Sequence, residues 1–347
     1  MIRTWREQKG VSQKKLGLVV GVTRQTIAAW EKRERAPSAM QLGKIAEELG
    51  VSLDLLVGQQ TGTGTSLLFR ADAPAVLSGE LCRLLTRKAE DYAAVEKLSG
   101  SFPVIPASRP WVGDNSGFIE EAAREIRCWL GAESAPLGDV LTLLEAKGLK
   151  IIPQDLPNEV SGLSAYTEDL GGVIFVNSCH TPERQFFTGL HELAHLIFHR
   201  KEYSVPSGNT AENDPRERMA NGIAGAVLLP RHLVERELKP YRNRWIPAPL
   251  LGDLKNRYSV GMRTILQRAE QVGIISRGQM EKQLGKITAE FGADGEDYQL
   301  PRPCAVRRLE RLVFLALAEE KITASQAADI LETSLVEVEN RLGLWIG

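Results

Sequence analysis

The sequence predicts an α+β protein that is predominantly helical, and three observations lead to this class. A chain of 347 residues is too long for one ordinary domain, so two or three domains, each with its own core, are expected. Apolar residues recur at helical spacing in several segments, whereas short apolar runs bounded by Gly and Pro, typical of strands, occur in only one part of the chain. The segment VGQQTGTGTS (57–66) has almost nothing to bury and indicates a flexible linker.

These changes of pattern divide the chain. An all-α N-terminal domain precedes the linker, and a connecting helical region with a helical pattern over 78–98 follows it. A central helical domain then contains two expected strands, LKIIP and GGVIFVN, and a helical C-terminal region ends the chain. The expected boundaries are 1–56, 57–66, 67–114, 115–287 and 288–347.

Composition narrows the functional classes. The N-terminus has no apolar segment typical of a signal peptide, and no stretch is typical of a membrane span, so we expect a cytoplasmic protein with no membrane partner. Four widely spaced cysteines without a CxxC pair argue against a disulfide framework. The net charge is −1, but residues 1–40 contain nine Lys and Arg against three Asp and Glu, so this end could meet a polyanion.

The segment TGLHELAHLIFH (188–199) contains three of the five histidines, at intervals of four. Residues i and i+4 share one face of a helix, so His191 and His195 can direct two imidazoles at one point, an arrangement that Zn²⁺ accepts. Glu192 is turned by about 100° and lies beside the metal, where a carboxylate can take a proton from water. His199 lies about 12 Å from His191 along the axis and is not expected to bind the same ion.

A catalytic zinc also needs a third protein ligand, and Glu217, 22 residues downstream of the second histidine, is the candidate. Asn221 projects from the same face four residues later and could support a ligand from behind. A structural alternative is a helix N-cap at Asp214 with a glutamate three residues later. Glu212 and Asp214 are the alternative ligands.

The segments RQFFTGLHELAHLIFH and ERMANGIAGAVLLP resemble the ImmA/IrrE family of bacterial zinc metallopeptidases. The resemblance covers roughly residues 115–275, including LEAKGLKIIP, SGLSAY and GGVIFVN. It implies a zincin-like helical domain around a small sheet, which cleaves XRE-type repressors in phage, mobile-element or stress-response circuits. On this chain it implies three zinc ligands and a general base: His191, His195 and Glu217, with Glu192.

The stretch SQKKLGLVVGVTRQTIAAWEKRERAPS is typical of two short helices joined by a tight turn. Leu16, Val20, Ile27 and Trp30 supply an apolar face, and Gly21 permits the turn. The pattern resembles the XRE-type helix-turn-helix, whose second helix lies in the major groove of DNA.

Seven polar residues are candidate DNA contacts. Side chains at the N-terminal end of the second helix can reach base edges: Thr23, Arg24, Gln25 and Thr26. Three more would meet phosphates, which position a protein without specifying sequence: Gln13, Lys14 and Arg33. The alternative is a protein-binding helical module with a solvated basic face.

Two functions follow from these sites. The preferred one is a transcriptional regulator that binds a double-stranded DNA operator and whose zinc-dependent peptidase domain cleaves a regulatory protein of the repressor type. The alternative is a non-enzymatic transcription factor or XRE-type antitoxin, whose zinc domain senses or binds a partner such as a toxin. Operators of two-fold symmetry suggest a homodimer in either case.

Overall fold

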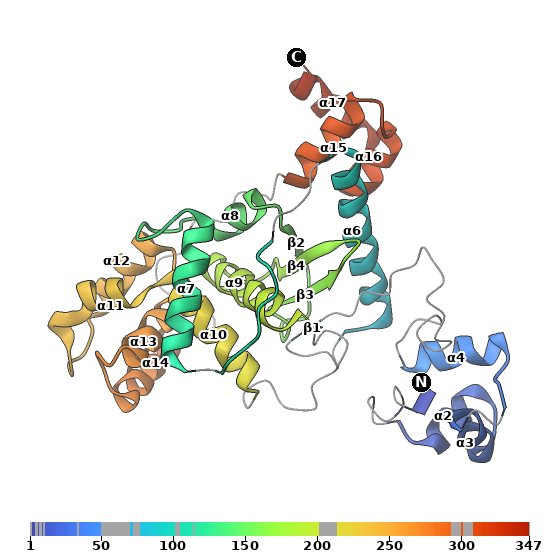
Figure 1. Ribbon diagram of the computed structural model, residues 1–347, viewed down its shortest axis with the longest axis horizontal. Coiled ribbons are helices and arrows are strands. Elements are labelled where there is room, and N and C mark those ends of the chain that lie inside the picture. Colours follow the sequence, from blue (N-terminus) through green and yellow to red (C-terminus); the bar gives the residue numbers. More distant parts are fainter. Residues whose placement is uncertain are drawn as a thin grey trace. The chain divides into compact units, whose positions relative to one another are not determined.

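The computed structural model describes residues 2–3, 6, 9, 11–32, 35–49, 70–71, 77–100, 105–113, 115–200, 214–292, 300 and 308–346. The chain forms two compact units: unit 1 consists of 1–67 and 74–88, and unit 2 of 68–73 and 89–347 (Figure 1). The predicted linker at 57–66 lies outside the described residues, and the division of the chain into five segments stays a prediction.

Unit 1 contains the predicted pair of helices, α2 (Gln13–Val20) and α3 (Arg24–Glu31), together with α4 (Ala39–Leu49). Ser12 and Thr23 cap the first two helices by accepting hydrogen bonds from the backbone N–H groups of Lys15 and Thr26. Gly21 ends α2 in the left-handed region, with φ of 77°.

Gly17 supports the same turn, although the sequence did not indicate it. A Cβ at this position would lie 2.7 Å from the carbonyl oxygen of Val22, so only glycine lets the turn come this close. The core between the helices consists of Ile2, Val11, Leu16, Val20, Ile27, Trp30, Ile45, Ala46 and Leu49.

The long helix α6 (Gly79–Leu98) confirms the helical pattern predicted for 78–98. Residues from Ala89 onward belong to unit 2. Tyr92 and Val95 on this part are buried.

The sheet of unit 2 has four strands in the order β1-β3-β4-β2, with bounds β1 (Arg70–Ala71), β2 (Lys150–Gln154), β3 (Gly162–Thr167) and β4 (Gly171–Asn177). β3 is antiparallel to both its neighbours, and β2 is parallel to β4. β2 and β4 confirm the two predicted strands. The sequence did not predict β1 and β3, because GLSAYT has no continuous apolar run and RA is too short to show a pattern.

Two helices pack against this sheet, α8 (Val140–Ala146) and α9 (Pro182–Phe198), and two more lie beyond α9, α7 (Ser116–Leu130) and α10 (Pro215–Leu228). α9 packs against β3 and β4 on one side and against α10 on the other, and α10 also packs against α7 (Figure 1). α9 starts at Pro182 after Thr181, whose side chain makes no capping hydrogen bond, and α10 starts at Pro215 after Asp214.

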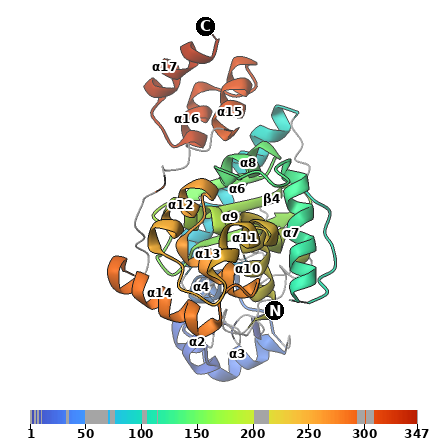
Figure 2. The same ribbon diagram turned by 90° about the vertical axis from the view of Figure 1, so that its left-hand side faces the viewer.

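The remaining helices of unit 2 form two groups. The first extends the core beyond α10: α11 (Arg231–Leu238), the 3-10 turn η4 (Lys239–Tyr241), α12 (Ala248–Tyr258), α13 (Met262–Gln271) and α14 (Arg277–Phe291) (Figure 2). The second is a small bundle near the C-terminus: α15 (Arg308–Ala318), α16 (Ala324–Leu331) and α17 (Leu335–Ile346).

These elements confirm the predicted class, a predominantly helical α+β protein with a small sheet in its central part. Of the helices in the described part of the chain, none combines the length and the apolar character needed to cross a bilayer.

Candidate functional site

One face of α9 carries the two histidines of the predicted metal site. His191 and His195 are one helical turn apart, and their Nε2 atoms lie 3.0 Å from each other. Their ring centroids are 4.6 Å apart, with the ring planes at 76°. Both side chains are almost fully buried, so helix α9 fixes two imidazoles on a single point inside the protein.

Glu217 reaches the same point from the first turn of α10. Its Oε2 lies 3.1 Å from Nε2 of His191 and 3.3 Å from Nε2 of His195. Burial raises the pKa of the Glu217 carboxyl, but hydrogen bonds with the two histidines lower it more, so this pKa lies well below its usual range. The helix contact between α9 and α10 therefore brings together residues 22 positions apart, as the sequence predicts.

The three ligand atoms fit a small divalent cation. All lie within 4.8 Å of one another. In a tetrahedral zinc site with bonds of about 2.0–2.1 Å, neighbouring ligand atoms are about 3.3 Å apart, close to the spacing observed here. Two imidazole nitrogens and a carboxylate oxygen are a donor set that zinc accepts.

Asn221 and His199 lie behind the two histidines. Oδ1 of Asn221 is 2.9 Å from Nδ1 of His191, so an Nδ1–H here leaves the Nε2 lone pair directed at the cluster. Nδ1 of His199 is 2.8 Å from Nδ1 of His195, and His199 is fully buried. The sequence excluded His199 as a ligand but missed this supporting contact, which the repeated spacing of four residues could have indicated.

Glu192 directly follows His191 on α9, and its side chain is 1% exposed. The hydroxyl of Ser164 on β3 donates a hydrogen bond of 2.5 Å to Oε2 of Glu192. The sequence missed Ser164, because nothing in the motif points to a strand residue 28 positions upstream. Gly162 lets β3 approach α9 closely, since a Cβ there would lie 2.4 Å from Cγ2 of Thr188.

Asp214 and Glu212 are the two alternative ligands near the start of α10. The side chain of Asp214 caps the helix by accepting from the backbone N–H of Arg216, and it also pairs with the guanidinium of Arg216 at 2.6 Å. The cap and the contact of Glu217 with the histidines thus exist side by side. Glu212 lies outside the described residues.

Four predicted DNA contacts in unit 1 line one hollow at the junction of α2 and α3: Gln13, Thr23, Arg24 and Gln25. Arg24 Nε donates to Oε1 of Gln13, and Nε2 of Gln13 donates to Glu31. Lys14 is exposed on α2. The hydroxyl of Thr26 lies 3.0 Å from that of Thr23. Arg33 lies outside the described residues.

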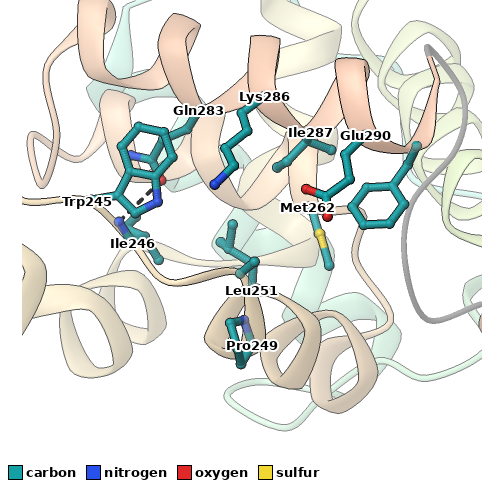
Figure 3. A pocket seen from close by; sticks show the side chains of 11 residues that line it. Trp245, Ile246, Pro249, Leu251, Met262, Gln283, Lys286, Ile287 and Glu290 are labelled. Carbon is teal, nitrogen blue, oxygen red and sulfur yellow. Dashed lines mark hydrogen bonds between the residues drawn. The ribbon is translucent and has the colours of Figure 1, made fainter.

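A second hollow, of about 180 Å³, lies between α14 and the segment that leads into α12. Figure 3 shows Lys286, Ile287 and Glu290 on one side of it, with Leu251 and Pro249 opposite. None of the residues that line it belongs to the metal cluster, so this hollow does not form part of that site.

Comparisons with known proteins match both regions. Residues 2–56 match the family model described as helix-turn-helix, and residues 144–270 match a peptidase family model described as the IrrE N-terminal-like domain. Over 53 residues the chain is 42% identical to an uncharacterized HTH-type transcriptional regulator, YgzD, of Bacillus subtilis (strain 168). This match covers 15% of the chain and 80% of that regulator.

Proposed function

Because the chain belongs to the helix-turn-helix regulators of the XRE type and carries a peptidase domain of the ImmA/IrrE family, we propose that it binds a DNA operator and cleaves a regulatory protein of the repressor type. The observation that carries the proposal is the convergence of His191, His195 and Glu217, together with the burial of Glu192, the residue that follows His191 on α9. The circuit would be that of a phage, a mobile element or a stress response.

In this proposal each residue of the site has one role. His191, His195 and Glu217 hold Zn²⁺, which when bound supplies Lewis-acid activation of water and of the scissile carbonyl. Glu192 accepts the proton of the attacking water and passes it to the leaving amine. Ser164 orients the carboxylate of Glu192 through its hydrogen bond, and Asn221 orients the ring of His191.

The experiment that tests the enzyme is Glu192→Gln. The neutral amide has nearly the same shape but cannot accept a proton, so we expect normal zinc content and a cleavage rate lower by about 10² to 10⁴. Purified zinc-loaded protein is mixed with the regulators encoded by neighbouring genes, and fragments are followed by mass spectrometry. Cleavage by the variant at the rate of the unaltered protein contradicts the role of Glu192.

A second prediction concerns the operator. Arg24→Ala removes a side chain that can make paired hydrogen bonds to a guanine, so operator binding should weaken by about 1–3 kcal/mol with a loss of sequence preference. Lys14→Ala is the matched control: it should weaken binding to all DNA sequences alike and lower the salt dependence. Equal operator binding by Arg24→Ala and the unaltered protein, over a range of salt concentrations, would remove α3 as the recognition helix.

A further inference from the structure

Two residues from the region between the two domains, Arg70 and Ala71, pair with part of the outer edge of β3. β4 pairs with one side of β3, and β1 pairs with the other, antiparallel, with Arg70 opposite Ser164 and Ala71 opposite Leu163. Adjacent strands lie about 4.8 Å apart, so the backbone of β1 runs directly beside that of β3.

This edge of β3 lies next to the proposed general base. Ser164, the partner of Arg70 in the register, is the residue whose hydroxyl contacts Glu192. A Cβ built on Gly162, two residues earlier, would lie 3.8 Å from Cγ of Glu192. β1 therefore pairs with the part of β3 that contacts Glu192, the residue that would accept the proton during hydrolysis.

A peptide bound at a sheet edge adopts the conformation that β1 has. Extended peptides commonly bind proteins by adding a strand to an exposed edge, where main-chain hydrogen bonds hold them. Residues 68–73 are grouped with unit 2, although the residues on both sides, up to 67 and from 74 to 88, are grouped with unit 1. The peptidase domain thus holds a strand from the chain that connects it to the DNA-binding domain.

We propose that this segment is a substrate of the chain's own peptidase domain, cleaved in cis at or next to the peptide bond between Arg70 and Ala71. The inference rests on the proposed peptidase function. The oxygen of water bonds to the scissile carbonyl carbon, the C–N bond breaks, and the proton taken by Glu192 goes to the new amine. The products are a fragment with the helix-turn-helix and a fragment with the peptidase domain, and no further reactant is needed.

Self-cleavage has a regulatory consequence. Covalent attachment gives the segment a high effective concentration at the site, so it competes with any external substrate. Cleavage removes the peptidase from the operator and opens the edge of β3 at the same time. DNA-bound regulator and operator-independent peptidase are then successive states of one chain.

The test uses the full-length, zinc-loaded chain, with three variants. Glu192→Gln tests chemistry, and the pair Arg70→Pro with Ala71→Pro removes two backbone N–H groups that could pair with β3. The pair Gly62→Pro with Thr63→Pro in the predicted linker is the matched control. Fragments are identified by N-terminal sequencing, and cleavage of the neighbouring-gene regulators is measured in parallel.

We expect a zinc-dependent fragment whose N-terminus lies within 69–73, formed at a rate that does not change on dilution. Glu192→Gln should abolish it, the proline pair at 70 and 71 should slow it on the order of tenfold, and the control pair should leave it unchanged. If the neighbouring-gene regulators are cleaved while the chain itself stays intact, this inference is overturned and the proposed function still holds. Equal self-cleavage by both proline variants, or a rate that rises with concentration, also overturns it. No cleavage of either substrate by zinc-loaded protein overturns the proposed function as well.

Discussion

Two buried polar clusters in unit 2 differ in how their charges balance. The first, here called the α6–α15 cluster, joins Glu96 to Lys150 at 2.5 Å and to Arg308 at 2.6 Å. Glu145 completes it by accepting hydrogen bonds from the hydroxyl of Tyr92 and from the backbone N–H of Arg308. The charges of its two carboxylates and two cations cancel within the chain.

The second cluster, the candidate metal site, is built from groups of a different kind. It brings together two imidazoles and one carboxyl group, from His191, His195 and Glu217, none of which is a permanent cation. Burying a charge is costly unless an opposite charge accompanies it. The charges of the α6–α15 cluster balance one another, whereas the converging acceptors of the candidate metal site would be balanced by a cation bound from outside.

The environment of Lys150 illustrates the balanced case. Burial lowers the pKa of this ammonium group, and Glu96 beside it works in the opposite direction. The side chain is fully buried on β2, so its charge depends on the partner from α6. The α6–α15 cluster therefore ties α6 and α15, segments more than 200 residues apart in sequence, to the sheet region.

The largest effect on stability is expected at Glu96. Glu96→Ala leaves Lys150 and Arg308 as two buried cations without their shared carboxylate, which should lower the free energy of unfolding by about 3–5 kcal/mol. Urea unfolding followed by circular dichroism measures the change. The control is Glu121→Ala, which removes an exposed ion pair with Arg124 and should not move the transition. A stability loss no larger than that of the control would show that the cluster is not balanced as described.

Glu217→Gln tests the candidate metal site. The binding free energy of a structural zinc site is roughly 10–16 kcal/mol, shared by four ligands. Losing one ligand should therefore weaken zinc binding by about 3 kcal/mol, which is a loss of affinity of about 10² to 10³. In the metal-free protein, glutamine keeps a side-chain oxygen near the histidines but loses the charge that they stabilise, so a modest loss of stability is expected. The measurements are zinc stoichiometry after dialysis against a mild chelator and urea unfolding without metal. Stoichiometric zinc with normal helix content would instead favour Glu212 or Asp214 as the third ligand.

Much of the fold could be predicted where the signal is local. The caps at Ser12 and Thr23, and the proline starts of α9 and α10, depend on residues a few positions apart. β3 could not be predicted, because its sequence shows no pattern typical of a strand. Its residues are buried through packing against α9 and the neighbouring strands. The contact of Arg308 with α6 likewise depends on tertiary packing across the whole unit.

The candidate site divides in the same way. The histidine spacing on α9 indicated a shared point, and helix geometry alone placed the two imidazoles there. Glu217 required the further assumption that a second helix packs against the first, which the resemblance to a known family supported. Ser164 and His199 were missed, because the first lies on an unpredicted strand and the second was judged only as a ligand and not as a partner of His195.

The smallest effect is expected at Asn221, which touches the metal centre only through His191. Asn221→Ala removes the acceptor that holds the Nδ1–H of the ring, so the lone pair of Nε2 is less firmly directed at the cluster. Supporting residues of this kind typically contribute 10- to 100-fold in metal affinity, about 1.4–2.7 kcal/mol. Competition with a chelator measures the affinity, and unfolding of the metal-free protein measures any general damage. Asn221→Asp keeps an acceptor oxygen at the same position and should restore most of the affinity, which a purely steric role would not explain. If the alanine variant binds zinc as tightly as the unaltered protein, the helix α9 alone orients His191, and the metal centre depends on its three converging atoms and not on the residues behind them.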